Sequence, residues 1–318
     1  MSAPKDRLDK VFAQCLQHHP EGHATYEQIS ARDLKPGACG YIDENGAWNK
    51  IAQMTDEAAM NMLGWTCPKD LATVEKAGKE KWPQAKTSKN LSWSSTDVDA
   101  GADVPGMQAG GRIKMEYQKA EGNGAIMMAD GEVKHRRAKP LSTAVDWLAQ
   151  NASSILEKFK DAQTNGIWVV TSTHVAERRV LAVLSSHQTT FSWTVEVKAA
   201  DVGSIAPSSS WVRERQDGSW IEQEDKDGVV LFFCGIQWDP RRIFRKLRRQ
   251  REDQKYLGAD EDKGLDAIEV ELDSSGIEGE ARFTRFKLVP KLVGTVEDVH
   301  LKADYDSEDD SEDEEDGN

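Results

Sequence analysis

Apolar and polar residues alternate with a period of two along the middle of this 318-residue sequence, and that alternation constrains the fold most. In GGRIKMEYQK, the residues Ile113, Met115 and Tyr117 alternate with charged ones, and TFSWTVEVK repeats the pattern from Phe191. Such alternation is typical of strands with one buried face and one wet face. An α+β fold is therefore expected, with a twisted antiparallel sheet, flanking helices and long mobile hairpins.

Two hairpins are predicted in this region. The first occupies 110–137 and turns at 121–124, and the second occupies 166–198 with a turn at 176–179. Pairs of arginines, Arg136-Arg137 and Arg178-Arg179, interrupt the alternation in both.

Other segments have their own signals. Helices are predicted at 8–16, at 55–63 and from about Ala144 to near Asn165-Gly166, where apolar residues from Ala144 to Phe159 recur at three- and four-residue steps. Asn45-Gly46 predicts a tight hairpin. The stretch 68–110 is rich in Lys, Ser, Asp, Gly and Ala with little periodicity, which predicts a long mobile loop.

Charge is distributed unevenly along the chain. Residues 304–318 hold ten carboxylates and no cation, which leaves a formal charge of −4 out of −14 for the residues before them. We expect 296–318 to be a disordered acidic tail. By contrast, RRIFRKLRRQR carries seven cations in eleven residues. A basic helix is predicted at 240–258, with Ile243, Phe244 and Leu247 on one side.

Catalytic and cofactor-binding motifs are not found in the sequence. Neither GxGxxG nor GxxxxGK[ST] occurs, so the chain is expected not to be an enzyme and to need no cofactor or metal. The four cysteines lack CxxC spacing and are expected to be structural thiols in a reducing compartment. No run approaches the roughly 18 apolar residues of a membrane helix, and the start lacks a signal core. A cytoplasmic protein is expected.

The order of these elements resembles the pore-forming domain of the gasdermin family. In that family a strand of the type V-x-V-V-T-E follows a helix and precedes a charged turn. Here IWVVTST and VAERRVLAV stand in that place, with Ser172 where the family often has an acid. GVVLFFCGIQW would be the apolar strand that closes the family's sheet, and LKPGACGYIDENGAW looks like the segment before its first mobile loop. The resemblance covers 34–238 and is nearer to fungal gasdermin-like proteins than to animal ones.

This resemblance implies a pore-forming domain at 1–295 that moves from the cytoplasm to anionic membranes and forms a homo-oligomeric β-barrel, with regulated cell death as its setting. An activating protease or partner protein would start the process. The strands implied to enter the membrane carry Ile113, Met115, Tyr117, Ile126, Met128, Trp168, Val170, Val183, Phe191, Trp193 and Val195. Their arginine pairs would then lie at turns or at the level of lipid headgroups. The alternative is that these are ordinary half-buried sheet strands.

The basic cluster would then bind lipid. Each cation near an anionic leaflet contributes on the order of 1 kcal/mol. The cluster comprises Arg241, Arg242, Arg245, Lys246, Arg248, Arg249 and Arg251. We expect the acidic tail to compete with lipid for these cations, and phosphorylation of Ser307 or Ser311 would strengthen that competition. The alternative is a tail that only keeps the protein soluble.

A second function remains open on the sequence alone. A basic helix and an acidic tail also suit a soluble nuclear or cytosolic protein that binds partners. Nucleic acid is not favoured as the partner, because the residues before the tail are net negative and lack an aromatic-laced basic surface elsewhere.

Overall fold

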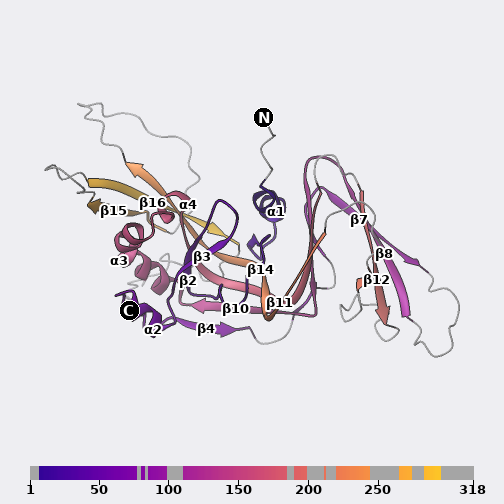
Figure 1. Ribbon diagram of the computed structural model, residues 1–318, viewed down its shortest axis with the longest axis horizontal. Coiled ribbons are helices and arrows are strands. Elements are labelled where there is room, and N and C mark those ends of the chain that lie inside the picture. Colours follow the sequence, from indigo (N-terminus) through magenta and orange to yellow (C-terminus); the bar gives the residue numbers. More distant parts are fainter. Residues whose placement is uncertain are drawn as a thin grey trace, which may run out of the picture.

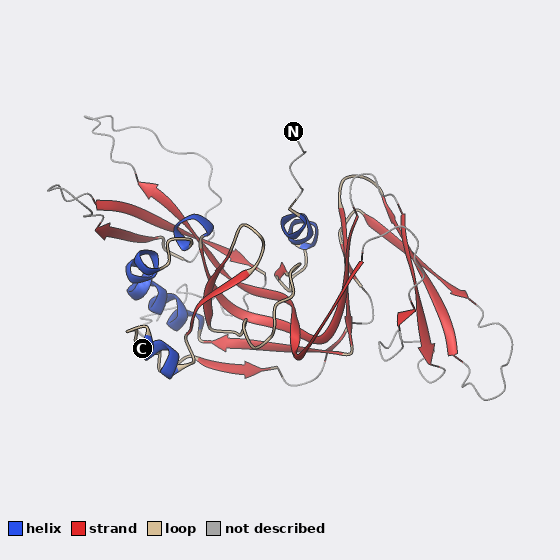
Figure 2. Ribbon diagram, viewed as in Figure 1, coloured by secondary structure: helices blue, strands red, loops and turns tan. Residues whose placement is uncertain are grey.

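The structure is a computed structural model, and it describes residues 7–76, 80–82, 85–98, 110–184, 190–198, 211–212, 220–243, 265–273 and 283–294. Antiparallel strands dominate it and helices are few, which confirms the predicted α+β class (Figure 2). The helices are α1 (Leu8–Leu16), α2 (Glu57–Met62), α3 (Leu141–Lys158) and α4 (Ala162–Asn165).

The strands form two sheets. The main sheet has twelve strands, whose central path is β15-β16-β14-β11-β10-β4. They are β1 (His23–Ala24), β2 (Ala38–Ile42), β3 (Trp48–Gln53), β4 (Ala72–Glu75), β5 (Glu80–Lys81), β6 (Lys86–Thr87), β9 (Gly124–Asp130), β10 (Glu132–Lys139), β11 (Ile167–Leu184), β14 (Trp220–Ile243), β15 (Ile268–Asp273) and β16 (Phe283–Val293). The second sheet has four strands in the order β13-β12-β8-β7: β7 (Leu91–Val98), β8 (Gly110–Lys119), β12 (Thr190–Lys198) and β13 (Trp211–Val212).

The two sheets lie at different ends of the molecule. Figure 1 shows β7, β8 and β12 at one end, while α2, α3 and α4 cluster against the main sheet at the other. Helix α3 confirms the helix predicted from three- and four-residue steps, since one face is buried. The buried residues are Leu141, Ala144, Trp147, Leu148, Ala152, Ile155 and Leu156. They share a core with Trp238 of β14 and with Phe286 and Leu288 of β16.

The turn predicted at 176–179 is wrong, because β11 is one strand of 18 residues that passes through it. Arg179 lies directly opposite Gln223 of β14 and Ala129 of β9. The guanidinium is fully buried and hydrogen-bonded, so the charge does not require a turn. A shift in register between Ala176 and Arg178 is the local irregularity that remains.

The first predicted hairpin is also wrong in its pairing. The chain does turn at 121–124, where Gly122 has a φ of 69°, but β8 does not pair with β9. Strand β8 pairs with β7 and β12, whereas β9 pairs with β11 and β6. Two strands joined by a short turn therefore lie in different sheets, which local alternation cannot indicate.

The predicted loop at 68–110 contains the four strands β4 to β7. Their residues gave no alternating signal because three of them are short, and β4 is exposed along its whole length. Strand β7, with the sequence LSWSSTDV, is largely polar. The part of the predicted loop at 99–109 lies outside the described residues. The Asn45-Gly46 turn between β2 and β3 is confirmed.

Candidate functional site

The four-stranded sheet has one apolar face and one polar face. In antiparallel strands, residues directly opposite each other share a face. The pairing sets Tyr117 opposite Phe191, Met115 opposite Trp193, and Ile113 opposite Val195. All six of these residues were expected on membrane-inserting strands, and the pairing brings them together on a single face.

The neighbouring strands continue both faces. On the apolar face, Trp93 of β7 lies opposite Tyr117, and Trp211 of β13 lies opposite Val195. Ser95 and Asp97 are the polar residues of β7 on this face. The register puts Lys119, opposite Leu91, on the apolar face as well. The other face carries Val98, Val212 and the polar residues Ser92, Ser94, Thr96, Arg112, Lys114, Glu116, Gln118, Thr190, Ser192, Thr194, Glu196 and Lys198. The sheet is therefore amphipathic as a whole.

Two strands of this sheet have the length that a membrane strand needs. Strands β8 and β12 contain 10 and 9 residues, and a tilted transmembrane strand needs about 9–11, while β7 is shorter with 8 residues. Within the described residues, β7 and β13 each pair with one strand only, so they are the edges of this sheet. An edge strand leaves one row of backbone N–H and C=O groups for another chain to pair with.

The four strands of the second sheet have the same order as four strands of the main sheet that precede or follow them in the chain. There β6, β9, β11 and β14 are neighbours in that order, and in the second sheet β7, β8, β12 and β13 follow the same order. The chain passes between the sheets at 88–90, 120–123, 185–189 and 213–219, and the last two stretches lie outside the described residues. We call the described crossing at 88–90 and 120–123 the elbow.

Two side chains in the connection between β6 and β7 hold the elbow together. The Asn90 amide donates to the carbonyl oxygens of Glu121 and, at 2.9 Å, of Asn123. Ser88 exchanges hydrogen bonds with the backbone of Ala125, donating its N–H at 3.0 Å and accepting on Oγ at 3.2 Å. These bonds replace the ladder that the bend interrupts, because buried backbone groups need partners. Sequence reasoning placed this segment in a loop and missed Asn90.

The segment from α1 to β1 packs over the elbow. Cys15 Sγ lies 3.5 Å from the carbonyl oxygen of Asn123, and His19 Nε2 lies 3.0 Å from that of Thr87. Glu21 forms an ion pair with Lys86 of β6. Strand β1 then pairs with β14 through Phe232 and Phe233. The N-terminal segment therefore touches both the elbow and the main sheet beside it.

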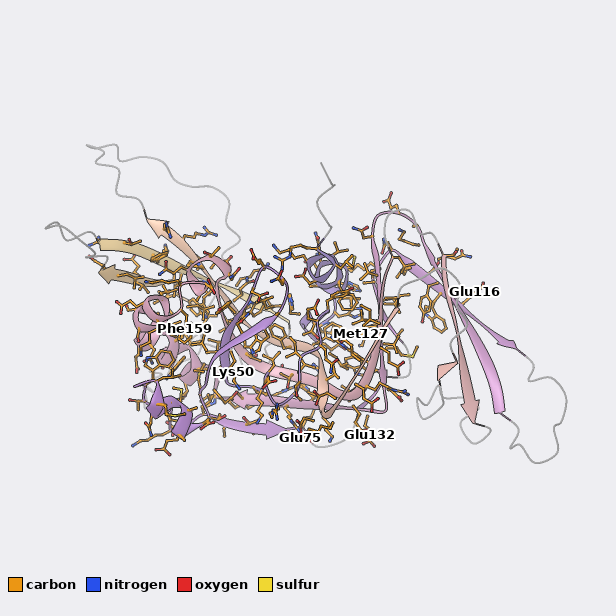
Figure 3. The ribbon with its side chains drawn as sticks, in the orientation of Figure 1. Lys50, Glu75, Glu116, Met127, Glu132 and Phe159 are labelled. Carbon is orange, nitrogen blue, oxygen red and sulfur yellow. The ribbon has the colours of Figure 1, made fainter. Side chains whose placement is uncertain are left out.

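The other residues expected to enter the membrane lie in the body of the protein. Ile126 and Met128 are buried in β9, and Trp168 and Val170 are buried in β11. Val183 is half-buried against the core beneath α1. Figure 3 shows the separation of the two regions, with Glu116 in the four-stranded sheet and Met127 in the body. These five residues pack as core and are not part of the amphipathic sheet.

The start of the basic cluster is strand, so the predicted helix is wrong over 240–243. Strand β14 continues to Ile243 and pairs there with β16. Arg241 lies exposed opposite the exposed Lys287, and the Arg242 guanidinium lies 5.7 Å from the centroid of the Phe286 ring. The backbone joins the sheet because β16 offers a free edge to its last residues.

The rest of the charged regions cannot be compared with their predictions. Outside the described residues lie Arg245, Lys246, Arg248, Arg249, Arg251, the acidic tail, Ser307 and Ser311.

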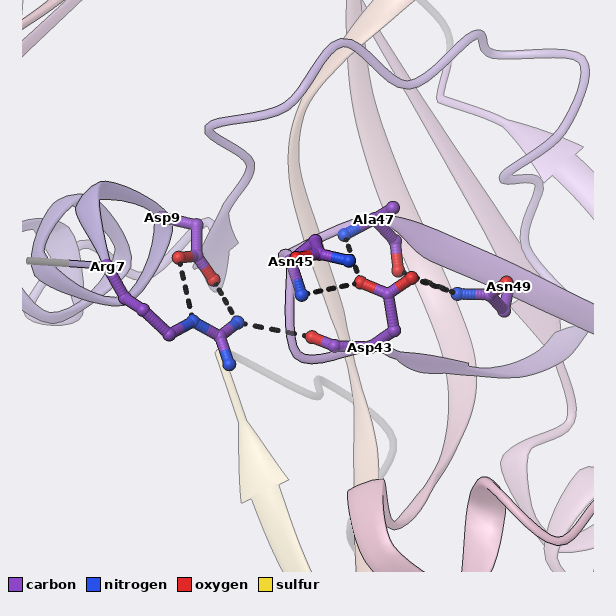
Figure 4. Close-up of polar contacts among 6 residues, drawn as sticks. All are labelled: Arg7, Asp9, Asp43, Asn45, Ala47 and Asn49. Carbon is purple, nitrogen blue, oxygen red and sulfur yellow. Dashed lines mark hydrogen bonds and ion pairs between the residues drawn. The ribbon is translucent and has the colours of Figure 1, made fainter. Parts of the chain in front are cut away.

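A cleft of about 660 Å³ opens beside the N-terminal segment. On its rim, Arg7 donates to both carboxylate oxygens of Asp9 and, at 3.1 Å, to the carbonyl oxygen of Asp43 (Figure 4). Asp43 in turn accepts from Asn49 Nδ2 at 3.0 Å. His23 and Lys291 also line the cleft. The rim groups pair with one another, so this network joins α1 to the β2–β3 turn.

Groups for other chemistry are sparse. The four cysteines are free thiols. Within the part of the chain that the structure describes, no three His, Cys, Asp or Glu residues gather as metal ligands. The described helices are too short or too polar to cross a membrane.

Comparisons with known proteins give similarities to solved structures only. No family model matches the sequence, and no curated protein matches it. Among solved structures, the cryo-EM structure of the gasdermin A3 membrane pore aligns with 80% of this chain and 95% of its own. The aligned residues are 10% identical and the TM-score is 0.27. A TM-score this low does not establish a shared fold.

Proposed function

We propose that this protein permeabilises membranes by inserting its four-stranded sheet into the bilayer. The observation that supports this most is the register of β7, β8, β12 and β13, which collects the apolar residues on one face. An amphipathic sheet suits a barrel wall, with one face toward lipid and the other toward a water-filled interior. The order of elements shared with gasdermin pore-forming domains favours the same activity.

A single copy cannot complete this structure. In lipid every backbone N–H and C=O needs a partner, so an open sheet edge is excluded from the hydrocarbon region. Strands β7 and β13 would therefore pair with neighbouring copies, β7 of one against β13 of the next, until the ring closes. We propose a homo-oligomer assembled on the membrane, acting without catalysis.

Anionic lipid is the proposed recruiting partner. Arg241 and Lys287 lie side by side on an exposed face of β14 and β16, and the cations after Ile243 follow directly in sequence. Attraction to anionic lipid of about 1 kcal/mol per cation would draw a cytoplasmic protein to the surface. The acidic tail would restrain it until a protease or a partner removes the tail, and cell death would be the result.

Dye release from vesicles tests this function. Phosphatidylcholine vesicles with and without phosphatidylserine would receive the full chain and a chain shortened to end at Val296. We expect leakage by the shortened chain from the anionic vesicles only.

Two neighbouring substitutions on β12 test the face. Trp193→Glu places a carboxylate on the apolar face, where it costs on the order of 2 kcal/mol in hydrocarbon, so leakage should fall about tenfold or more. Ser192→Glu adds the same charge to the polar face and should leave leakage nearly unchanged. Equal effects of the two substitutions would contradict the proposed orientation. If no form leaks or binds vesicles while the protein stays folded, a soluble partner-binding protein is the better conclusion.

A further inference from the structure

Three histidines lie within six residues, from just after α1 to the first residue of β1. They are His18, His19 and His23. The rings of His18 and His19 have centroids 4.1 Å apart with 36° between their planes. Two imidazolium ions at that separation repel each other, so the docked arrangement favours neutral rings. Protonating both rings therefore adds repulsion within the docked segment, although the Glu21 carboxylate, 3.9 Å from His19 Nδ1, acts against it.

His19 contacts the last residue of β6, directly before the elbow. A carbonyl oxygen only accepts, so Nε2 carries the proton that is donated to Thr87. The ring also meets the edge of Phe232, with centroids 6.0 Å apart. Burial lowers the pKa of His19, and His18 and Lys86 lower it further, while the Thr87 hydrogen bond and Glu21 oppose them. The docked ring resists protonation.

His18 lies near Lys89, in the connection between β6 and β7. Burial and the nearby Lys89 lower its pKa, whereas the Cys15 backbone and Glu21 raise it by less. The net direction is the same as for His19. Both rings of the adjacent pair are therefore held neutral by their surroundings.

His23 packs at the start of β1. Its ring centroid lies 5.4 Å from that of Trp168 and 5.1 Å from that of Phe233, and one edge of the ring opens into the cleft. Asp9 of α1 and Lys291 of β16 are the charged groups around it. Burial lowers the pKa of His23 to about 4, with Lys291 acting in the same direction and Asp9 against it.

Glu21 adds a contact that acid also weakens. Its carboxylate pairs with Lys86, whose Nζ lies 4.6 Å from the centroid of the Trp82 ring. Burial raises the pKa of Glu21, but the hydrogen bond from Lys86 and the charge attraction bring the net pKa below its usual value. Protonating Glu21 would remove the ion pair that holds the segment to β6.

We propose that residues 8–24 form a clamp on the elbow that acid releases. Above pH 6.5 the histidines are neutral whether docked or released, and docking is strongest. Below pH 6.5 the released histidines take up protons that the docked ones refuse, so docking weakens as the pH falls toward 4. Loss of the Glu21 contribution follows below about pH 4.5.

The size of the effect follows from the histidine shift. For His23 alone, a change of pKa from 6.5 to about 4 lowers the docking equilibrium constant at most about 30-fold between pH 8 and pH 5. His18 and His19 add to this. Release would expose Phe12 and Leu16, which are fully buried when docked, and would free the elbow on which the amphipathic sheet depends.

Hydrogen–deuterium exchange of the full chain tests the clamp without a membrane. Peptides covering 8–24 and α3 would be followed at pH 7.5, 6.0 and 5.0, with rates corrected for intrinsic exchange. We expect protection of 8–24 to be lost by pH 5 while α3 stays protected. Equal protection of 8–24 at pH 7.5 and pH 5 would overturn the proposal.

Variants identify the titrating groups. The double variant His18→Gln, His19→Gln and the single variant His23→Phe should each keep protection to a lower pH than the natural chain. Lys10→Gln, an exposed change on α1 without a histidine, should leave the midpoint unchanged. Unshifted midpoints in both histidine variants would contradict the proposal. If His23→Phe loses α3 protection at pH 7.5, the double variant decides alone, because His18 and His19 are only partly buried.

This result is independent of dye release. If acid removes the protection of 8–24 but no form causes leakage, the clamp is supported and the membrane function is not. If leakage occurs while the protection of 8–24 does not depend on pH, the membrane function is supported and the clamp is not.

Discussion

Arg179 Nε donates a hydrogen bond of 2.7 Å to Oε1 of Gln223, directly opposite it on β14, and the pair is buried. The guanidinium also donates to the backbone carbonyls of Thr25, Tyr26 and Glu27. The Arg179 side chain therefore joins β11 and β14 to the segment that follows β1. No carboxylate is within hydrogen-bonding distance among the described residues, so carbonyl dipoles carry the compensation for the buried charge.

Replacing Arg179 should cost much more stability than replacing its neighbour. Arg179→Met leaves several buried carbonyls without donors, and we expect the free energy of unfolding to fall by about 3 kcal/mol. Arg178 is partly exposed and pairs with Asp130 and Glu222, so Arg178→Met should cost about 1 kcal/mol or less. Urea titration measures both. Similar losses in the two variants would mean that the buried network does not stabilise the protein.

The elbow should loosen when Asn90 loses its amide. Asn90→Ala removes the donor to the carbonyl oxygens of Glu121 and Asn123, and we expect about 1–2 kcal/mol of local stability to be lost. Hydrogen exchange of the amides at 120–125 should speed up about tenfold, since 1.4 kcal/mol is a factor of ten. Ser92→Ala removes only an exposed 3.3 Å bond to Gln118 and serves as the control. Unchanged exchange in Asn90→Ala would show that the bend is held by other contacts.

The sequence allowed the elements with strong local periodicity to be predicted. Helix α3 and strands β8, β11 and β12 follow their apolar patterns, and the Asn45-Gly46 turn follows from its two residues. Their partners could not be predicted, because the pairing of β8 with β12 joins residues such as Tyr117 and Phe191 that are far apart in the chain. Period-two alternation says which residues share a face and not which strand lies alongside.

Charged residues misled the prediction in two places. Arg179 was expected at a turn because a charge within an apolar run usually marks exposed chain, and Arg241 was expected in a helix because Ile243, Phe244 and Leu247 would fall on one side of it. The acceptors of Arg179 come from residues about 150 positions earlier and from Gln223, 44 positions later, and the strand that pairs with Arg241 comes more than 40 positions later. Neither partner has a sequence signal near the arginine. The apolar residues of β8 and β12 were predicted from their alternation, whereas Trp93 of β7, Trp211 of β13 and Asn90 were not.

A methyl group at Gly235 should disrupt the pairing of β11 with β14. A Cβ at this position would lie 2.3 Å from the carbonyl oxygen of Val169, a backbone atom that cannot move without opening the ladder. We expect Gly235→Ala to lower the free energy of unfolding by about 3 kcal/mol. Gly131→Ala is the matched control, because its φ of 81° strains the new side chain while open space surrounds it, and its cost should stay near 1 kcal/mol. Denaturant unfolding of the two variants separates steric overlap from backbone strain. A smaller loss for Gly235→Ala than for Gly131→Ala would show that β11 and β14 adjust to the added atom.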